Sequence, residues 1–109
     1  MKTITYEDFD KLDIKVGTVT AVEKVAKSNK LLKLLVDIGD KTSLQILSGI
    51  SQFYSEDSLM DKQVLVLVNL KPRMLMGFES QGMVLAAVEE DRPVLLSTDQ
   101  PVKNGCKIS

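Results

Sequence analysis

The side chains that most often perform catalysis are scarce in this sequence. There is no histidine among the 109 residues, so the commonest general base and the commonest metal ligand are both missing. The single cysteine, Cys106, cannot form an intrachain disulfide or a cysteine-based metal cluster. We expect Cys106 to be a partly buried structural residue near the end of a strand. The sequence therefore predicts a protein without catalytic chemistry, cofactor or metal.

Basic side chains are the remaining candidates for chemistry, and they are unevenly distributed. The formal net charge of -1 argues, taken alone, against nucleic-acid binding. The basic residues nevertheless form two groups without intervening acids: Lys24, Lys27, Lys30 and Lys33, and then Lys71 and Arg73. The acids gather elsewhere, notably within 56–61 and 89–91. This segregation predicts a positive face that attracts a polyanion. The alternative, that these lysines only increase solubility, stays open.

The elements that must position these residues are mostly strands. Alternating or continuous apolar residues predict strands over 14–22, 31–38, 42–47, 63–70, 83–88, 93–96 and 106–108. Gly17 predicts a bulge that bends the first strand. A capping box at Thr5 and Asp8 predicts a helix over 6–12, with Phe9 and Leu12 facing the core. A second short helix is expected over 56–60, and 71–78 is expected to be a basic loop.

The order of these elements predicts an all-β fold, a five-stranded OB-fold barrel with short helices. A helix between the third and fourth strands and a bent first strand are typical of that barrel. The length predicts a single domain over residues 1–109. No apolar run approaches the roughly 18 residues of a membrane span, and the first ten residues lack a signal-peptide pattern. We expect a cytoplasmic protein, and Met1 and Ser109 favour a complete chain.

Five blocks of sequence, in order, resemble the tRNA-binding domain family. That family includes the C-terminal domain of methionyl-tRNA synthetases and free-standing dimeric tRNA-binding proteins. The resemblance extends from about Phe9 to Ile108. The blocks are DIKVG at 13–17, NKLLKL with VDIG at 29–39, LSGI at 47–50, NLKPR at 69–73 and ESQGMVLA at 79–86. Leu47 and Ser51 depart from the usual choices beside the third block, which affects packing more than function.

The resemblance implies how this chain would bind and assemble. It implies an OB fold whose C-terminal extension, about 88–108, is used for homodimerisation, and capture of tRNA by structure rather than by sequence. The RNA-facing positions of the family correspond here to Lys33, Asn69, Lys71, Arg73, Ser80 and Met83, to which we add Lys30. Lysine and arginine neutralise phosphates, while short polar side chains reach sugar hydroxyls or base edges. Met83 would contact an unstacked base.

Each of these residues also has a purely structural interpretation. Asn69 can satisfy backbone groups at a strand end, Ser80 can cap a turn, and Met83 can belong to the core. Gly82 allows close approach of RNA, or it marks a strand bulge.

Three functions remain at this stage. The first is a tRNA-binding homodimer that serves in trans as an auxiliary subunit of methionyl-tRNA synthetase. The second is a dimeric secretion chaperone of the same fold that binds peptides; that branch ends in a stretch like Asp99–Ile108. The third, an enzyme that uses a carboxylate pair, has no supporting group of residues. The blocks at 30–33 and 48–50 favour the first.

Overall fold

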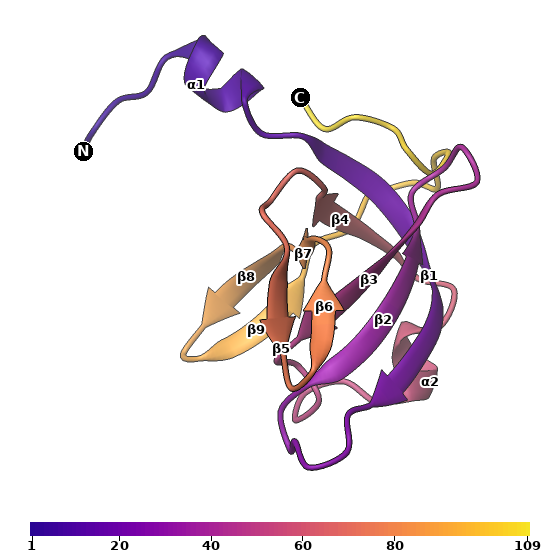
Figure 1. Cartoon of the computed structure of the whole chain (residues 1–109). Helices are drawn as coiled ribbons and strands as arrows, with labels where there is room; N and C mark the ends of the chain where they lie inside the picture. The colour runs from indigo at the N-terminus through magenta and orange to yellow at the C-terminus, as the bar shows by residue number, and fades with distance from the viewer.

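The computed structural model describes residues 1–109 and consists mainly of antiparallel strands (Figure 1). The main sheet has the strand order β3-β2-β1-β4-β7. Its strands are β1 (Ile14–Lys24), β2 (Leu32–Asp37), β3 (Ser43–Ser48), β4 (Gln63–Leu67) and β7 (Met83–Val84). The Gln81 amide donates to the Gln45 carbonyl (2.8 Å), which brings the two edges of the sheet together. The nearly closed five-stranded barrel confirms the predicted all-β, OB-like fold.

The remaining elements are short and lie around this barrel. Helix α1 (Tyr6–Asp10) precedes it, and α2 (Glu56–Leu59) connects β3 to β4 as predicted. Two hairpins extend from the barrel: β5 (Arg73–Leu75) with β6 (Phe78–Ser80), and β8 (Ala86–Glu89) with β9 (Arg92–Leu95). No helix in the structure is both long enough and apolar enough to cross a lipid bilayer.

Three strand predictions were wrong in detail. Residues 71–78, expected as a loop, contribute to the β5–β6 hairpin, whose turn has positive φ at Met76 (51°) and Gly77 (84°). Residues 83–88, expected as one strand, divide at Leu85, whose amide donates to the Leu65 carbonyl (3.0 Å) while its carbonyl accepts from Leu96 (3.0 Å). Residues 106–108 form only an isolated bridge, between Lys15 and Lys107.

Strand β1 bends, but not at the glycine that predicted the bend. The register between β1 and β2 shifts between Val19 and Ala21, so the bulge lies there. Gly17 serves close packing instead, because a Cβ on it would lie 2.5 Å from the Val36 Cγ1 atom. The bend lets one strand pair with β2 along its second half and with β4 along its first.

The core fills the barrel, and the termini lie outside it. Leu34, Val36 and Val66 have no exposed surface. The capping box of α1 is confirmed, but the helix projects from the barrel and buries none of its residues (Figure 1). The prediction that Phe9 and Leu12 face the core was therefore wrong: Phe9 is half-buried and Leu12 is 42% exposed. Cys106, expected to be partly buried, is exposed.

One polar side chain holds the C-terminal tail against the barrel. The Gln63 amide nitrogen donates to the Val102 carbonyl (2.6 Å) and its oxygen accepts from the Val102 amide (3.1 Å). The same side chain contacts Asn104 and Thr98, and the Gln63 carbonyl accepts from the Ser97 hydroxyl (2.7 Å). The first residue of β4 thus holds residues 97–104 of the tail in place.

Candidate nucleic-acid interface

A groove of about 440 Å³ lies on the barrel between the loop before β2, the end of β3, the β5–β6 hairpin and β9. Its walls are largely apolar, it includes two cations, and no carboxylate lines it. We call it the basic groove. Its sixteen lining residues are Leu31, Leu47, Ser48, Gly49, Ile50, Leu70, Lys71, Arg73, Leu75, Ser80, Gly82, Met83, Val84, Ala86, Pro93 and Leu95.

Side-chain hydrogen bonds hold the β5–β6 hairpin over β3 and so form one wall of the groove. The Ser80 hydroxyl accepts from the Leu47 amide (3.0 Å) and donates to the Gly82 carbonyl (3.1 Å). The Gln45 side chain donates to the Glu79 carbonyl (2.9 Å). Gly82 lets this segment approach β4, because a Cβ there would lie 2.9 Å from the Leu67 carbonyl oxygen. Close packing within the protein accounts for this glycine.

Four of the predicted site residues line the basic groove: Lys71, Arg73, Ser80 and Met83. Lys71 and Arg73 are exposed and belong to none of the five ion pairs in the molecule. Met83 is 44% exposed, so it is a surface residue of the groove and does not belong to the core. Ser80 is only 5% exposed, and both of its hydrogen-bonding functions are used inside the protein.

Lys30 and Lys33 lie outside the lining of the groove. Lys30 is exposed beside Leu31 in the loop before β2, and its carbonyl accepts from the Ser51 amide (2.9 Å). Lys33 points outward from β2. Its Nζ lies 3.1 Å from a carboxylate oxygen of Glu23 and 4.4 Å from the ring centre of Phe78. The structure therefore places Lys33 beside the turn end of the β5–β6 hairpin and pairs it with an acid.

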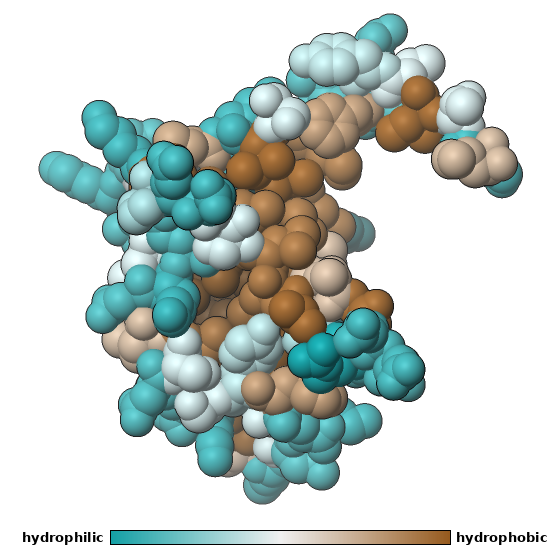
Figure 2. Space-filling view, turned by 180° about the vertical axis from the view of Figure 1, so that it is seen from behind, coloured by the Kyte–Doolittle hydropathy of each residue, from teal (hydrophilic) through white to brown (hydrophobic).

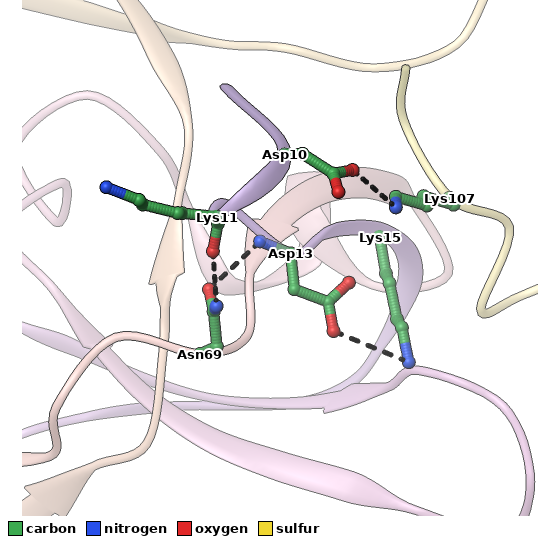
Figure 3. A network of polar contacts seen from close by, with 6 residues as sticks. All are labelled: Asp10, Lys11, Asp13, Lys15, Asn69 and Lys107. Atoms are coloured by element: carbon green, nitrogen blue, oxygen red, sulfur yellow. Dashed lines mark hydrogen bonds and ion pairs between the residues drawn. The ribbon is translucent and has the colours of Figure 1, made fainter. Parts of the chain in front are cut away.

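Asn69 is directed at the N-terminal segment, as Figure 3 shows. Its side-chain nitrogen donates to the Lys11 carbonyl (2.8 Å), and its oxygen accepts from the Asp13 amide (3.0 Å). Beside it, Lys107 lies 3.5 Å from Asp10, which connects the C-terminal tail to α1. Asn69 therefore satisfies backbone groups at the strand end, which agrees with its structural interpretation.

The sequence reasoning missed the apolar lining of the groove and the environment of Lys33. Leu70, Leu75 and Pro93 reach the groove from segments whose hydrophobicity could not be distinguished from that of core residues. Glu23 precedes the lysine-rich segment and pairs with Lys33 across two strands, which only the strand register reveals. Phe78 could have been found only by recognising the hairpin at 73–80.

The chemistry of the arrangement is that of binding. Two unpaired cations beside an apolar groove can hold a chain that carries phosphates, or an extended chain with apolar side chains. No group of three or more histidine, cysteine, aspartate or glutamate side chains is arranged to hold a metal ion.

The chain is similar to a described protein family and to several enzymes. Residues 14–107 match the family described as "Putative tRNA binding domain". The methionine–tRNA ligase of Archaeoglobus fulgidus is 50% identical over 105 residues, which cover 96% of this chain and 16% of that enzyme. The ligase of Methanoregula boonei is 52% identical, with 96% and 15% covered. The chain thus spans about one-sixth of the length of these relatives.

Two solved structures have nearly the same fold. A MetRS related protein from Pyrococcus horikoshii superposes with a TM-score of 0.93 at 34% identity, with all of both chains covered. The chaperone CsaA from Bacillus anthracis superposes with a TM-score of 0.89 at 33% identity, with 99% of this chain and 100% of that chain covered. With the match of residues 14–107, these similarities show that the chain belongs to the tRNA-binding domain family.

Proposed function

We propose that this chain is a non-catalytic cytoplasmic protein that binds folded tRNA through the basic groove and serves in trans as an auxiliary subunit of methionyl-tRNA synthetase. The observation that carries the proposal is that two cations, Lys71 and Arg73, form no ion pair and line a groove without carboxylates. In OB folds the face of the second and third strands, with its flanking loops, is where oligonucleotides bind. The groove lies at the margin of that face.

The predicted site residues divide into two roles under this proposal. Lys30, Lys33, Lys71 and Arg73 neutralise phosphates, and Met83 supplies an apolar contact. Asn69 and Ser80 act indirectly. Their polar atoms are already bonded to the N-terminal segment and to the hairpin, so they fix the shape of the surface that meets the RNA.

We further propose that the chain acts as a homodimer through its C-terminal extension, about 88–108. Four of its large apolar side chains are exposed: Val88 by 72%, Val94 and Leu96 by 38% each, and Val102 by 41%. Figure 2 shows hydrophobic surface gathered on the rear face, beneath the projecting N-terminal segment. A dimer presents two basic grooves on one body, which raises the effective concentration of the second contact.

A titration of fluorescent tRNA, read by anisotropy at several salt concentrations, tests the RNA function. The variant Lys71→Ala with Arg73→Ala should bind folded tRNA more weakly. Each lost phosphate contact should also reduce the slope of log K against log salt by about 0.7–0.9. Lys41→Ala with Lys103→Ala removes the same charge from exposed positions outside the groove, so this control should retain the wild-type slope. Equal slopes in both variants would contradict the proposed site.

A peptide-binding function is the second candidate. The largely apolar lining of the groove suits the side chains of an extended peptide, and the chaperone CsaA has a similar structure. The same titration separates the two functions when heat-unfolded tRNA and an unfolded peptide are added as competitors. Preference for folded tRNA with a steep salt dependence supports the first function. Peptide binding with indifference to RNA supports the second.

A further inference from the structure

A second, smaller depression of about 160 Å³ lies on the outer face of β1, β2 and β3. Its base is a row of cross-strand neighbours, because Ala21 pairs with Leu35 and Leu35 pairs with Gln45. Leu35 is 40% exposed, whereas Leu34 and Val36 on either side of it are fully buried inside the barrel. A large apolar side chain is therefore presented to solvent at the centre of the sheet.

Two charged side chains border this depression, and one of them contacts an aromatic ring. Lys33 and Glu23 line it, and the Lys33 ammonium lies over the ring of Phe78, 4.4 Å from its centre. Phe78 is 36% exposed, and its position is fixed because the hairpin is bonded to β3 through Ser80 and Gln45. The ring is thus held beside Lys33, a residue that lines the depression, and it is covered by a cation that is paired with Glu23 (3.1 Å).

The size and polarity of this depression suit a flat, hydrogen-bonding ring. Its volume is close to the roughly 150 Å³ of an engineered apolar cavity that accepts benzene. The Gln45 nitrogen is used by the Glu79 carbonyl, but the Gln45 side-chain oxygen accepts no hydrogen bond within the protein. That oxygen is free for an amine at the edge of a ring. The Lys33 side chain is long enough to leave Phe78 and contact a phosphate of the nucleic-acid chain that carries the ring.

We propose that this depression holds one unstacked nucleobase of the bound tRNA, stacked on the ring of Phe78. In the free protein the Lys33 ammonium covers the ring face, and it moves to the adjacent phosphate when the base enters. Base–aromatic stacking tolerates every base, so the contact adds affinity without reading sequence. This inference rests on the proposed tRNA-binding function and assigns to it a contact outside the basic groove.

Affinity for folded tRNA in four proteins tests the assignment: wild type, Phe78→Ala, Phe78→Tyr and Phe53→Ala. Phe78→Ala should weaken binding about 5- to 150-fold, the range for removal of one stacked base, and should leave the salt slope unchanged. Phe78→Tyr keeps the ring and should bind like wild type. Phe53 is 46% exposed and lines a different part of the surface, so Phe53→Ala is the matched control. Wild-type affinity of Phe78→Ala would overturn the proposal.

Methyl NMR spectra of Leu35 give a readout that does not depend on affinity for folded tRNA. A base stacked beside Leu35 should shift its methyl protons upfield when a short single-stranded RNA is added, and Phe78→Ala should abolish that shift. If wild type fails to bind folded tRNA, the proposed function fails, yet this shift would still support the subsite. An unmoved methyl signal under saturating RNA would overturn it. A shift produced by an unfolded peptide and not by RNA would also overturn it.

Discussion

The forces that stabilise the barrel differ from those that attach the terminal segments to it. All of the buried residues lie between Ile14 and Val84, and none lies in 1–13 or 85–109. The barrel is stabilised by apolar burial. The terminal segments are attached through polar side chains such as Gln63, Asn69 and Lys107, and through backbone hydrogen bonds such as those of Cys106 and Ile108 with β1. The fully buried core therefore contains no residue of the terminal segments, and Val88, Val94, Leu96 and Val102 of the C-terminal segment are exposed.

The largest effect is expected in the core of the barrel. Leu34→Ala should lower the free energy of unfolding by about 2–5 kcal/mol, because the side chain is fully buried and its loss leaves a cavity. Chemical denaturation followed by circular dichroism measures this change. Ile4→Ala, in the N-terminal segment at a position 69% exposed, is the control and should change the value by less than about 0.5 kcal/mol. Similar losses of unfolding free energy in both variants would show that the barrel core does not contribute more to stability than the terminal segments.

A smaller effect is expected where the hairpin is joined to the barrel. Ser80→Ala should cost about 1–3 kcal/mol, because the buried Leu47 amide loses its acceptor. Ser43→Ala is the matched control on β3, since the Ser43 side chain is exposed and makes no hydrogen bond within the molecule. The same denaturation measurement applies. A Ser80→Ala protein as stable as Ser43→Ala would show that the hydroxyl does not hold the hairpin.

The exposed apolar side chains of the C-terminal segment should matter for assembly more than for folding. Val88→Asp should shift sedimentation from dimer to monomer, because a carboxylate buried in an apolar interface is left without a partner. At protein concentrations below the association range, its free energy of unfolding should stay within about 0.5 kcal/mol of wild type. A wild-type protein that sediments as a monomer at every concentration would exclude the proposed dimer.

The smallest effect is expected at α1, and it depends on pH. Hydrogen bonds from the Thr5 backbone and then from Lys11 lower the pKa of Asp8 below its ordinary value of 3.8. A lowered pKa means that the unfolded helix binds the proton more readily, so the capping interaction is present above pH 3.8 and is lost as pH falls through the lowered value. The Thr5 amide resonance should report this loss. In Asp8→Asn it should not titrate.

The sequence predicted the parts of the fold that periodicity encodes. The strands over 14–24, 32–37, 43–48 and 63–67 were found because buried and exposed side chains alternate or run continuously apolar along them. The β5–β6 hairpin was missed because its three-residue strands are too short for a pattern and its turn depends on a left-handed Met76. Phe9 and Leu12 were misplaced because helical spacing does not say whether a surface exists to receive the helix.

For the site, too, local sequence indicated some features, whereas contacts between segments far apart in the chain could not be predicted from it. Lys71 and Arg73 form an acid-free pair in the sequence, and in the structure they line a groove without carboxylates. The pairing of Lys33 with Glu23 crosses between strands, and no local spacing reveals it. The roles of Asn69 and Ser80 could not be separated from a ligand-facing role, because residue type does not show which hydrogen bonds are already made.

The attachment of the tail to Gln63 has a consequence for the dynamics of the native state. Thr98 and Val102 bond only to the side chain of this one residue, so breaking its bonds frees 98–102, whereas Gly105, Cys106 and Ile108 stay bonded to the backbone of β1. The Val102 amide proton should then exchange with deuterium through this local opening, while amide protons of the barrel core exchange only on global unfolding. The stretch 98–102 thus opens separately from the end of the tail, and its opening is controlled by the side chain of the first residue of β4.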